Sequence, residues 1–175
     1  MSCALPPHRR YHSLQHLGEC IAQLEGALDL AVHAGDVEIA LWFHDAIYGL
    51  QAKDNEQRSA DWAAGELTRS GAGEAQVRRV RALIMATCHT AKPADADQQL
   101  LVDIDLAILG AEPARFAEYD AQVKAEYSWV PEVVYRTKRR EVLKGFLDRA
   151  VIYNTPLFRA RLEQQARTNL RTAIA

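Results

Sequence analysis

Histidine and aspartate side chains interrupt two otherwise apolar segments of this chain. The pair His44-Asp45 and, later in the chain, Asp103 and Asp105 are flanked on both sides by apolar residues. An unpaired buried charge costs several kcal/mol, so each of these side chains needs a hydrogen bond, an ion pair or a metal ion as a partner. One buried His or Asp is more often a hydrogen-bonded structural residue than a metal ligand, but their joint occurrence favours one shared site.

His12 and His16 extend this pattern to the preceding segment, which has helical periodicity. Four residues separate them, so on a helix both imidazoles lie on one face and at least one can approach the carboxylates. Imidazole nitrogens combined with carboxylate oxygens suit a divalent ion such as Mn, Fe, Co, Ni or Zn better than Ca. We therefore predict a metal ion with a catalytic rather than a structural role.

Composition limits the other classes of function. The 21 Lys and Arg residues against 23 Asp and Glu residues give a net charge of -2, which supplies no strong field for a nucleic acid partner. Cys3, Cys20 and Cys88 have neither disulfide nor metal-site spacing, which favours a reducing cytoplasm. No segment has the length and composition of a secretion signal or a membrane span, so we expect a cytoplasmic protein without a membrane partner.

Apolar residues recur with helical periodicity along nearly the whole chain, and no segment alternates with period two for long. This pattern predicts an all-α fold of about seven or eight helices in a single domain over residues 1–175. Asp36 is expected to cap the second helix, which is apolar nearly all round and therefore central. The predicted helices cover about residues 14–28, 37–48, 55–70, 74–88, 98–109, 112–127 and 132–149, with a last one from 158 onward.

Four segments resemble the HD superfamily of metal-dependent phosphohydrolases, namely residues 10–17, 40–48, 54–60 and 103–110. Members of that superfamily carry a His on one helix, a His-Asp doublet on the next and an Asp on a later helix around a metal ion. The resemblance implies a single HD-type domain with a motif core at about 8–110 and C-terminal helices at 112–175. It also implies a set of four metal ligands, His16, His44, Asp45 and Asp105.

The choice between the two late aspartates rests on the resemblance. Asp103 and Asp105 are two residues apart, roughly 200° around a helix, and cannot both face one ion. The family pattern favours Asp105, which leaves Asp103 as a capping or ion-paired residue, with Arg79 or Arg81 as partner. Relatives often carry paired histidines where this chain has Cys88-His89-Thr90, so His89 stays open as an accessory residue.

The resemblance implies hydrolysis of a phosphoester, of a nucleotide or of another small phosphorylated metabolite. A divalent ion with open positions, Mg included, polarises a phosphoryl oxygen and activates water near neutral pH. Asp45 would then lie beside that water, and Glu56 is either a general acid or base or only a capping-box acid. Arg58 is a candidate phosphate contact. The alternative function is that of a non-catalytic helical module that binds a small ligand or protein partner. Whether the protein forms a homo-oligomer is left open.

Overall fold

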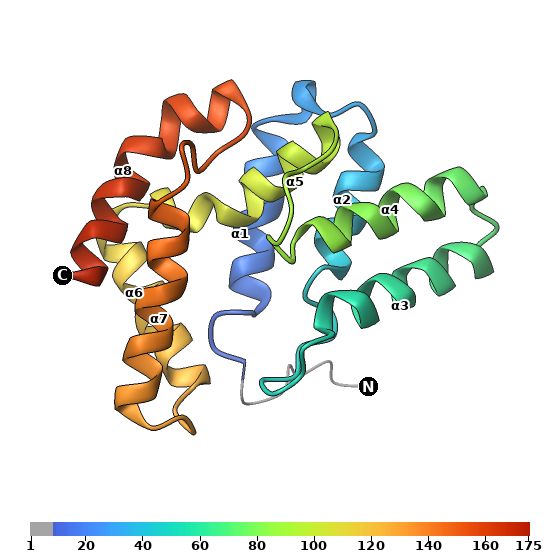
Figure 1. Cartoon of the computed structure of the whole chain (residues 1–175). Helices are drawn as coiled ribbons and strands as arrows, with labels where there is room; N and C mark the ends of the chain where they lie inside the picture. Colours follow the sequence, from blue (N-terminus) through green and yellow to red (C-terminus); the bar gives the residue numbers. More distant parts are fainter. Residues whose placement is uncertain (1–8) are drawn as a thin grey trace. The chain divides into compact units, whose positions relative to one another are not determined.

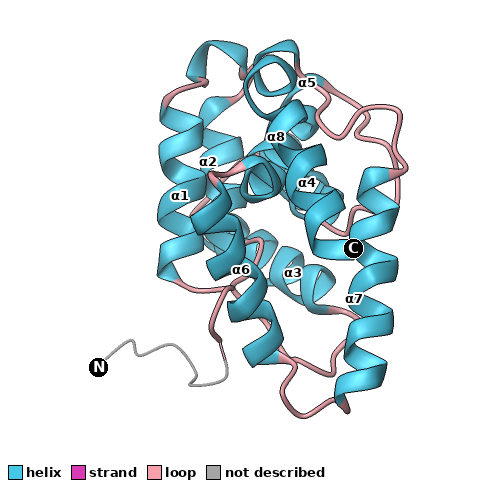
Figure 2. Ribbon diagram, turned by 90° about the vertical axis from the view of Figure 1, so that its left-hand side faces the viewer, coloured by secondary structure: helices cyan, strands magenta, loops and turns pink. Residues whose placement is uncertain are grey.

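The computed structural model describes residues 9–175, in which the regular elements are all helices (Figure 1). Figure 2 shows helices and loops in this part of the chain, and residues 9–175 contain no strand. The all-α prediction is confirmed. The α-helices are α1 (Leu14–Glu25), α2 (Ala34–Phe43), α3 (Asn55–Arg69), α4 (Glu74–Ala86), α5 (Ala96–Asp105), α6 (Pro113–Glu126), α7 (Glu132–Leu147) and α8 (Pro156–Ile174), and the 3-10 helices are η1 (Leu28–Leu30) and η2 (Leu106–Gly110).

Contacts between residues group the chain into two compact units. Leu17–Asp105 form one, here called the central unit, and Met1–His16 together with Leu106–Ala175 form the other, the terminal unit, which is described from residue 9. The end of the central unit lies close to the end of the motif core expected from the sequence. The expectation of one domain over residues 1–175 stays a prediction.

The central unit is built around α2. Helices α3 and α4 run side by side as a hairpin, and α2 packs against α3, α4 and α5 (Figure 1). Gly71 ends α3 with a φ of 83°, a left-handed conformation that favours glycine, and this allows the sharp turn into α4. The core consists of apolar side chains that are almost fully buried, including Val37, Leu41, Val80, Ile84, Leu100 and Ile104.

Helix α2 ends at Phe43, five residues before the predicted end at Tyr48. The chain leaves the helix because later backbone N–H groups find partners on α3. Ile47 N–H donates to Ser59 Oγ at 3.0 Å, and Gly49 N–H donates to an Asn55 side-chain oxygen at 2.9 Å. His44 and Asp45 therefore stand at the end of a helix, in a turn, rather than in the middle of one.

The start of α2 also differs from the prediction. The helix begins at Ala34 after His33, so Asp36 lies in its first turn and is not the N-cap. Asp36 is buried, and its carboxylate pairs with Arg79 at 2.7 Å. An acidic group is favourable in the first turn because it complements the helix dipole. The sequence suggested Arg79 or Arg81 as the ion-pair partner of Asp103. Arg79 pairs with Asp36 instead, and Arg81 pairs with Asp61.

The terminal unit packs α8 against η2 and α7. Its core includes Phe116, Leu143, Ile152, Tyr153, Phe158 and Leu170. The predicted fifth helix at 98–109 becomes the 3-10 helix η2 after Asp105. Side chains from α8 and from the segment before it explain this change. Tyr153 Oη donates to the Leu106 carbonyl and Asn169 Nδ2 donates to the Leu109 carbonyl. These carbonyls therefore have hydrogen-bond partners without the chain continuing as an α-helix.

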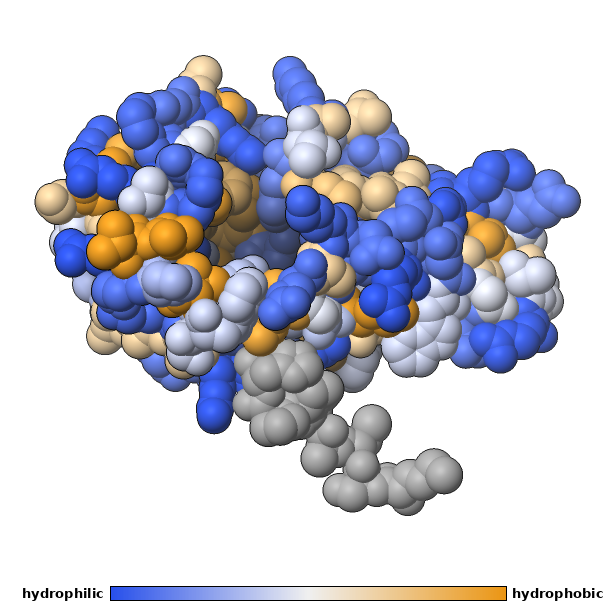
Figure 3. Space-filling model, turned by 60° about the horizontal axis from the view of Figure 1, so that its bottom comes forward, coloured by the Kyte–Doolittle hydropathy of each residue, from blue (hydrophilic) through white to orange (hydrophobic). Residues whose placement is uncertain are grey.

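Large apolar side chains also reach the surface, among them Trp129, Val133 and Val134 around the start of α7. Figure 3 shows hydrophobic residues (orange) on one face as small groups set among hydrophilic ones (blue). Scattered groups of this kind are normal for a folded protein. Every helix within residues 9–175 is too short or too polar to cross a lipid bilayer.

Candidate metal centre

Helix α1 carries His16 and Cys20 on one face, one turn apart, and both side chains are buried. The boundary between the two units falls inside this continuous helix, after His16. The helix itself therefore fixes His16 relative to Cys20. Tyr11 Oη lies 3.0 Å from His16 Nδ1, so this ring would bind a metal ion through Nε2.

His44 stands at the C-terminal end of α2 with its two ring nitrogens in different surroundings. Its Nδ1 lies 2.7 Å from the carbonyl oxygen of Leu41, which can only accept, so Nδ1 carries a proton. Nε2 lies 3.1 Å from Asp45 Oδ2 and 3.6 Å from Asp105 Oδ1. In the neutral ring, this arrangement directs the Nε2 lone pair towards two carboxylates, where a cation would be held.

The two carboxylates dominate the electrostatics of this site. Burial acts to lower the pKa of His44, but the nearby charges of Asp45 and Asp105 outweigh it and raise that pKa well above its usual range. Burial raises the pKa of the Cys20 thiol well above its usual range, and Asp105 and Asp45 add to this effect. The site therefore favours positive charge and disfavours a further negative one.

His89 approaches Asp105 from the loop after α4. Its Nε2 lies 2.9 Å from Asp105 Oδ2, so the Asp105 carboxylate lies between the rings of His89 and His44. The backbone of His89 has a φ of 54°, a left-handed conformation that is uncommon for any residue except glycine. Strained positions of this kind cluster at functional sites, where the surrounding contacts hold them.

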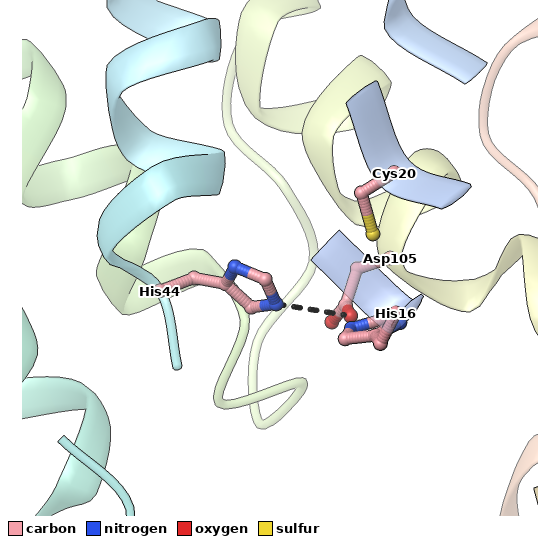
Figure 4. Close-up of side chains that lie close together, drawn as sticks. All are labelled: His16, Cys20, His44 and Asp105. Atoms are coloured by element: carbon pink, nitrogen blue, oxygen red, sulfur yellow. Dashed lines mark ion pairs between the residues drawn. The ribbon is translucent and has the colours of Figure 1, made fainter. Parts of the chain in front are cut away.

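Figure 4 shows His16, Cys20, His44 and Asp105, which come from α1, the end of α2 and the end of α5. One potential ligand atom from each of these four side chains lies within 4.8 Å of the others. Of the predicted ligands, the structure brings together His16, His44 and Asp105, and Asp45 lies against His44. Cys20 was not predicted. Its spacing of four from His16 was the available signal, the same spacing that drew attention to His12.

His12 does not share a helix face with His16, because α1 begins only at Leu14. This part of the prediction is wrong. The ring of His12 pairs instead with Glu126, whose Oε2 lies 2.8 Å from His12 Nδ1. The other oxygen of Glu126 accepts hydrogen bonds from the backbone N–H groups of Arg10, Tyr11 and His12. These bonds hold the segment before α1 inside the terminal unit.

Glu56 and Arg58 lie in the first turns of α3. The capping-box reading of Glu56 is wrong, because Glu56 is the second helical residue and the N-cap residue Asp54 makes no side-chain capping bond. Burial raises the pKa of Cys88, and the charge of Glu56 adds to this effect. Arg58 is exposed, and its part in phosphate binding stays a prediction.

Comparisons with protein-family models, with curated proteins and with solved structures found no match to this chain.

Proposed function

We propose that this protein is a metal-dependent phosphohydrolase that acts on a phosphoester of a small metabolite, such as a nucleotide. One observation carries the proposal: the Asp105 carboxylate lies between Nε2 of His44 and Nε2 of His89, while the Leu41 carbonyl fixes the other nitrogen of His44. Hydrogen bonds to the outer nitrogen of a histidine are typical of metal sites, where they orient the ring.

The donor set fits a divalent ion. His16, His44, Asp45 and Asp105 would hold it, and a set of nitrogen and oxygen ligands suits Mn, Fe, Co, Ni or Zn better than Mg, which takes oxygen ligands. Cys20 adds a buried thiol to this group, and a bound cation would favour its deprotonation. When bound, such an ion polarises a phosphoryl oxygen and lowers the pKa of water.

Other tasks, namely substrate access, the orientation of Asp105 and proton transfer, fall to residues of the chain itself. His44 is 3% exposed, whereas the side chain of Asp45 is 26% exposed and that of His89 19%, so substrate reaches the site from the side of Asp45 and His89. His89 holds one oxygen of Asp105 and thereby orients the other towards His44. Glu56, in the first turn of α3, is the candidate for proton transfer to the leaving group.

The test is metal analysis together with hydrolysis assays on the purified protein. We expect about one equivalent of a divalent ion per chain, and turnover of p-nitrophenyl phosphate or of a member of a nucleotide panel. The double variant His44→Ala/Asp45→Ala should lose both. His33→Ala is the matched control, because His33 also pairs with an aspartate, Asp97 at 2.9 Å, but lies outside the cluster.

Two results would contradict the proposal. A full equivalent of tightly bound metal in the double variant would show that the ligands lie elsewhere. Stoichiometric metal without turnover of any phosphoester would instead favour the alternative, a helical module that binds a small ligand or a protein partner without hydrolysis.

A further inference from the structure

The terminal unit is strongly basic, which the net charge of the whole chain hides. It contains fourteen Lys and Arg residues against eight Asp and Glu, a net charge of +6, while the central unit carries seven against fifteen, a net charge of -8. Helix α7 alone contributes five of the basic residues. A concave surface in such a unit lies in a positive field that attracts anions.

A cavity of about 480 Å³ lies in this unit, between α6, α7 and the end of α8. Four basic side chains line it: Lys124, Arg136, Arg139 and Arg140. Two acidic side chains also line it, but each already has a basic partner, since Asp120 pairs with Arg139 and Glu132 with Lys124. Within residues 9–175, no ion pair is formed by Arg136 or Arg140, and both are exposed.

Two residues that line the cavity, Tyr135 and Arg139, each carry a buried hydrogen-bond donor that lacks an acceptor within residues 9–175. Among the described residues, neither Tyr135 Oη nor Arg139 Nη2 has a hydrogen-bond partner, although both atoms are buried. The Arg139 guanidinium is held in place by its Nε bond to Asp120 at 2.9 Å and by its position over the Tyr119 ring, 4.8 Å from the ring centroid. A buried donor without an acceptor costs free energy, and a ligand oxygen in the cavity would remove that cost.

We infer that this cavity binds the phosphate group of a small phosphorylated molecule, at a site separate from the candidate metal centre. A tetrahedral oxyanion offers acceptors in several directions, so it can accept from Arg139 Nη2 and the Tyr135 hydroxyl together once these buried atoms turn towards the cavity. Arg136 and Arg140 would close around it from the exposed side. The volume lies within the range of small-molecule sites, which leaves room for more than phosphate alone. The remainder is lined by Thr137, Ala173, Ile174 and Ala175.

Burial also keeps Tyr135 in the form that donates. It raises the pKa of the Tyr135 hydroxyl to about 12, so the phenol stays neutral and retains its proton under physiological conditions. Replacement of Tyr135 by Phe removes this donor and keeps the ring. Because the hydroxyl has no partner among the described residues, that change should not lower the melting temperature.

The test is isothermal titration calorimetry of the full chain in phosphate-free buffer with EDTA, which excludes binding through a metal ion. Inorganic phosphate and glycerol 3-phosphate are the probes. We expect saturable binding of both by the unmodified protein, and a Kd at least about fivefold higher for Tyr135→Phe and for Arg136→Gln. Lys138→Gln is the matched control, since Lys138 is exposed on the same helix but does not line the cavity. Its Kd should stay within about twofold of the unmodified value, as should that of Asp105→Asn.

Phospholipid headgroups carry the same phosphate chemistry, so vesicles of phosphatidylcholine with and without phosphatidic acid form a second arm. Retention by the acidic vesicles without binding of either soluble phosphate would overturn the inference. The same holds if neither probe binds, or if Tyr135→Phe and Arg136→Gln bind phosphate as tightly as Lys138→Gln. Loss of hydrolytic activity in Asp105→Asn with phosphate binding intact separates this site from the proposed function.

Discussion

The two nitrogens of the His44 ring have different tasks, and this division gives the candidate metal centre its chemistry. Nδ1 is committed to the Leu41 carbonyl three residues earlier, which the end of α2 leaves without a helical partner at this position. Nε2 is thereby directed at Asp45 and Asp105. At this helix end the Leu41 carbonyl has no backbone donor to share among the described residues, so it fixes the His44 ring alone.

Asp103 and Asp105 should respond differently to loss of charge. Asp105→Asn should greatly reduce metal affinity, because it replaces an anionic oxygen beside a dication with a neutral one. Asp103 is fully buried and is not part of the cluster, so Asp103→Asn should keep the metal and change stability by about 1 to 3 kcal/mol. Metal stoichiometry and thermal unfolding of both variants measure this. Exchanged phenotypes would mean that the other face of α5 builds the site.

The helices themselves were largely predictable from apolar periodicity, and their ends were not. Helix α7 was expected at 132–149 and spans Glu132–Leu147, because its pattern is local. The premature end of α2 and the change from α5 to η2 depend on bonds from Ser59 and Tyr153, which are distant in sequence. For the same reason, periodicity placed His44-Asp45 in the middle of a helix. That His16, Cys20 and Asp105 lie close to His44 could be seen only in the fold.

Glu126 joins α6 to the segment before α1, and its contribution should depend on pH. Burial acts to raise the pKa of this carboxyl, but His12 and the backbone N–H groups of Arg10 and His12 lower it from 4.5 to about 2. The charged carboxylate therefore stabilises the fold above about pH 4.5, and this stability is lost as the pH falls towards 2. At pH 7 Glu126→Gln should cost about 3 kcal/mol.

Chemical denaturation of Glu126→Gln at pH 7 and at pH 3 checks this dependence. The difference from the unmodified protein should shrink at the lower pH. Glu118→Gln serves as the control, because Glu118 lies on the same helix with a half-exposed side chain and a 3.6 Å ion pair to Arg115. Such surface pairs contribute about 0 to 1 kcal/mol. An equal cost for both variants would show that the bonds of Glu126 add nothing.

The contact between η2 and α8 leaves no room for a side chain at Gly110. A Cβ there would lie 2.7 Å from Leu162 Cβ, 2.8 Å from the Leu162 carbonyl oxygen and 2.9 Å from Tyr153 Oη. Gly110→Ala should therefore push η2 and α8 apart and destabilise the terminal unit by about 1 to 3 kcal/mol.

Gly145 in α7 offers the opposite case, since a Cβ there would meet nothing within 4 Å. Gly145→Ala should stabilise the protein by about 0.5 to 1 kcal/mol through helix propensity. Thermal unfolding of the two variants compares them directly. A Gly110→Ala variant that melts at or above the unmodified protein would show that this packing is looser than described.

The net charge of the whole chain hides the opposite net charges of its two units. A net charge of -2 argued against polyanionic partners, yet it is the sum of a central unit at -8 and a terminal unit at +6. The sequence did not reveal this because the basic unit is assembled from both ends of the chain, residues 9–16 and 106–175. The candidate metal centre draws its carboxylates from the acidic unit, and the proposed phosphate cavity lies in the basic one.

Metal binding should stabilise the fold as a whole, because the proposed ligands span residues 16 to 105 and an unfolded chain does not hold them together. At a free metal concentration of about 100 times Kd the expected gain is about 2.7 kcal/mol, or roughly 5 to 10 °C in melting temperature for a chain of this length. Differential scanning calorimetry with added Mn²⁺ or Zn²⁺, followed by EDTA, measures this gain and its reversal. His44→Ala should melt at one temperature with or without metal, while His33→Ala should show the full shift, since His33 lies outside the cluster. If His44→Ala gains as much as the unmodified protein, the stabilising ion binds elsewhere on the molecule.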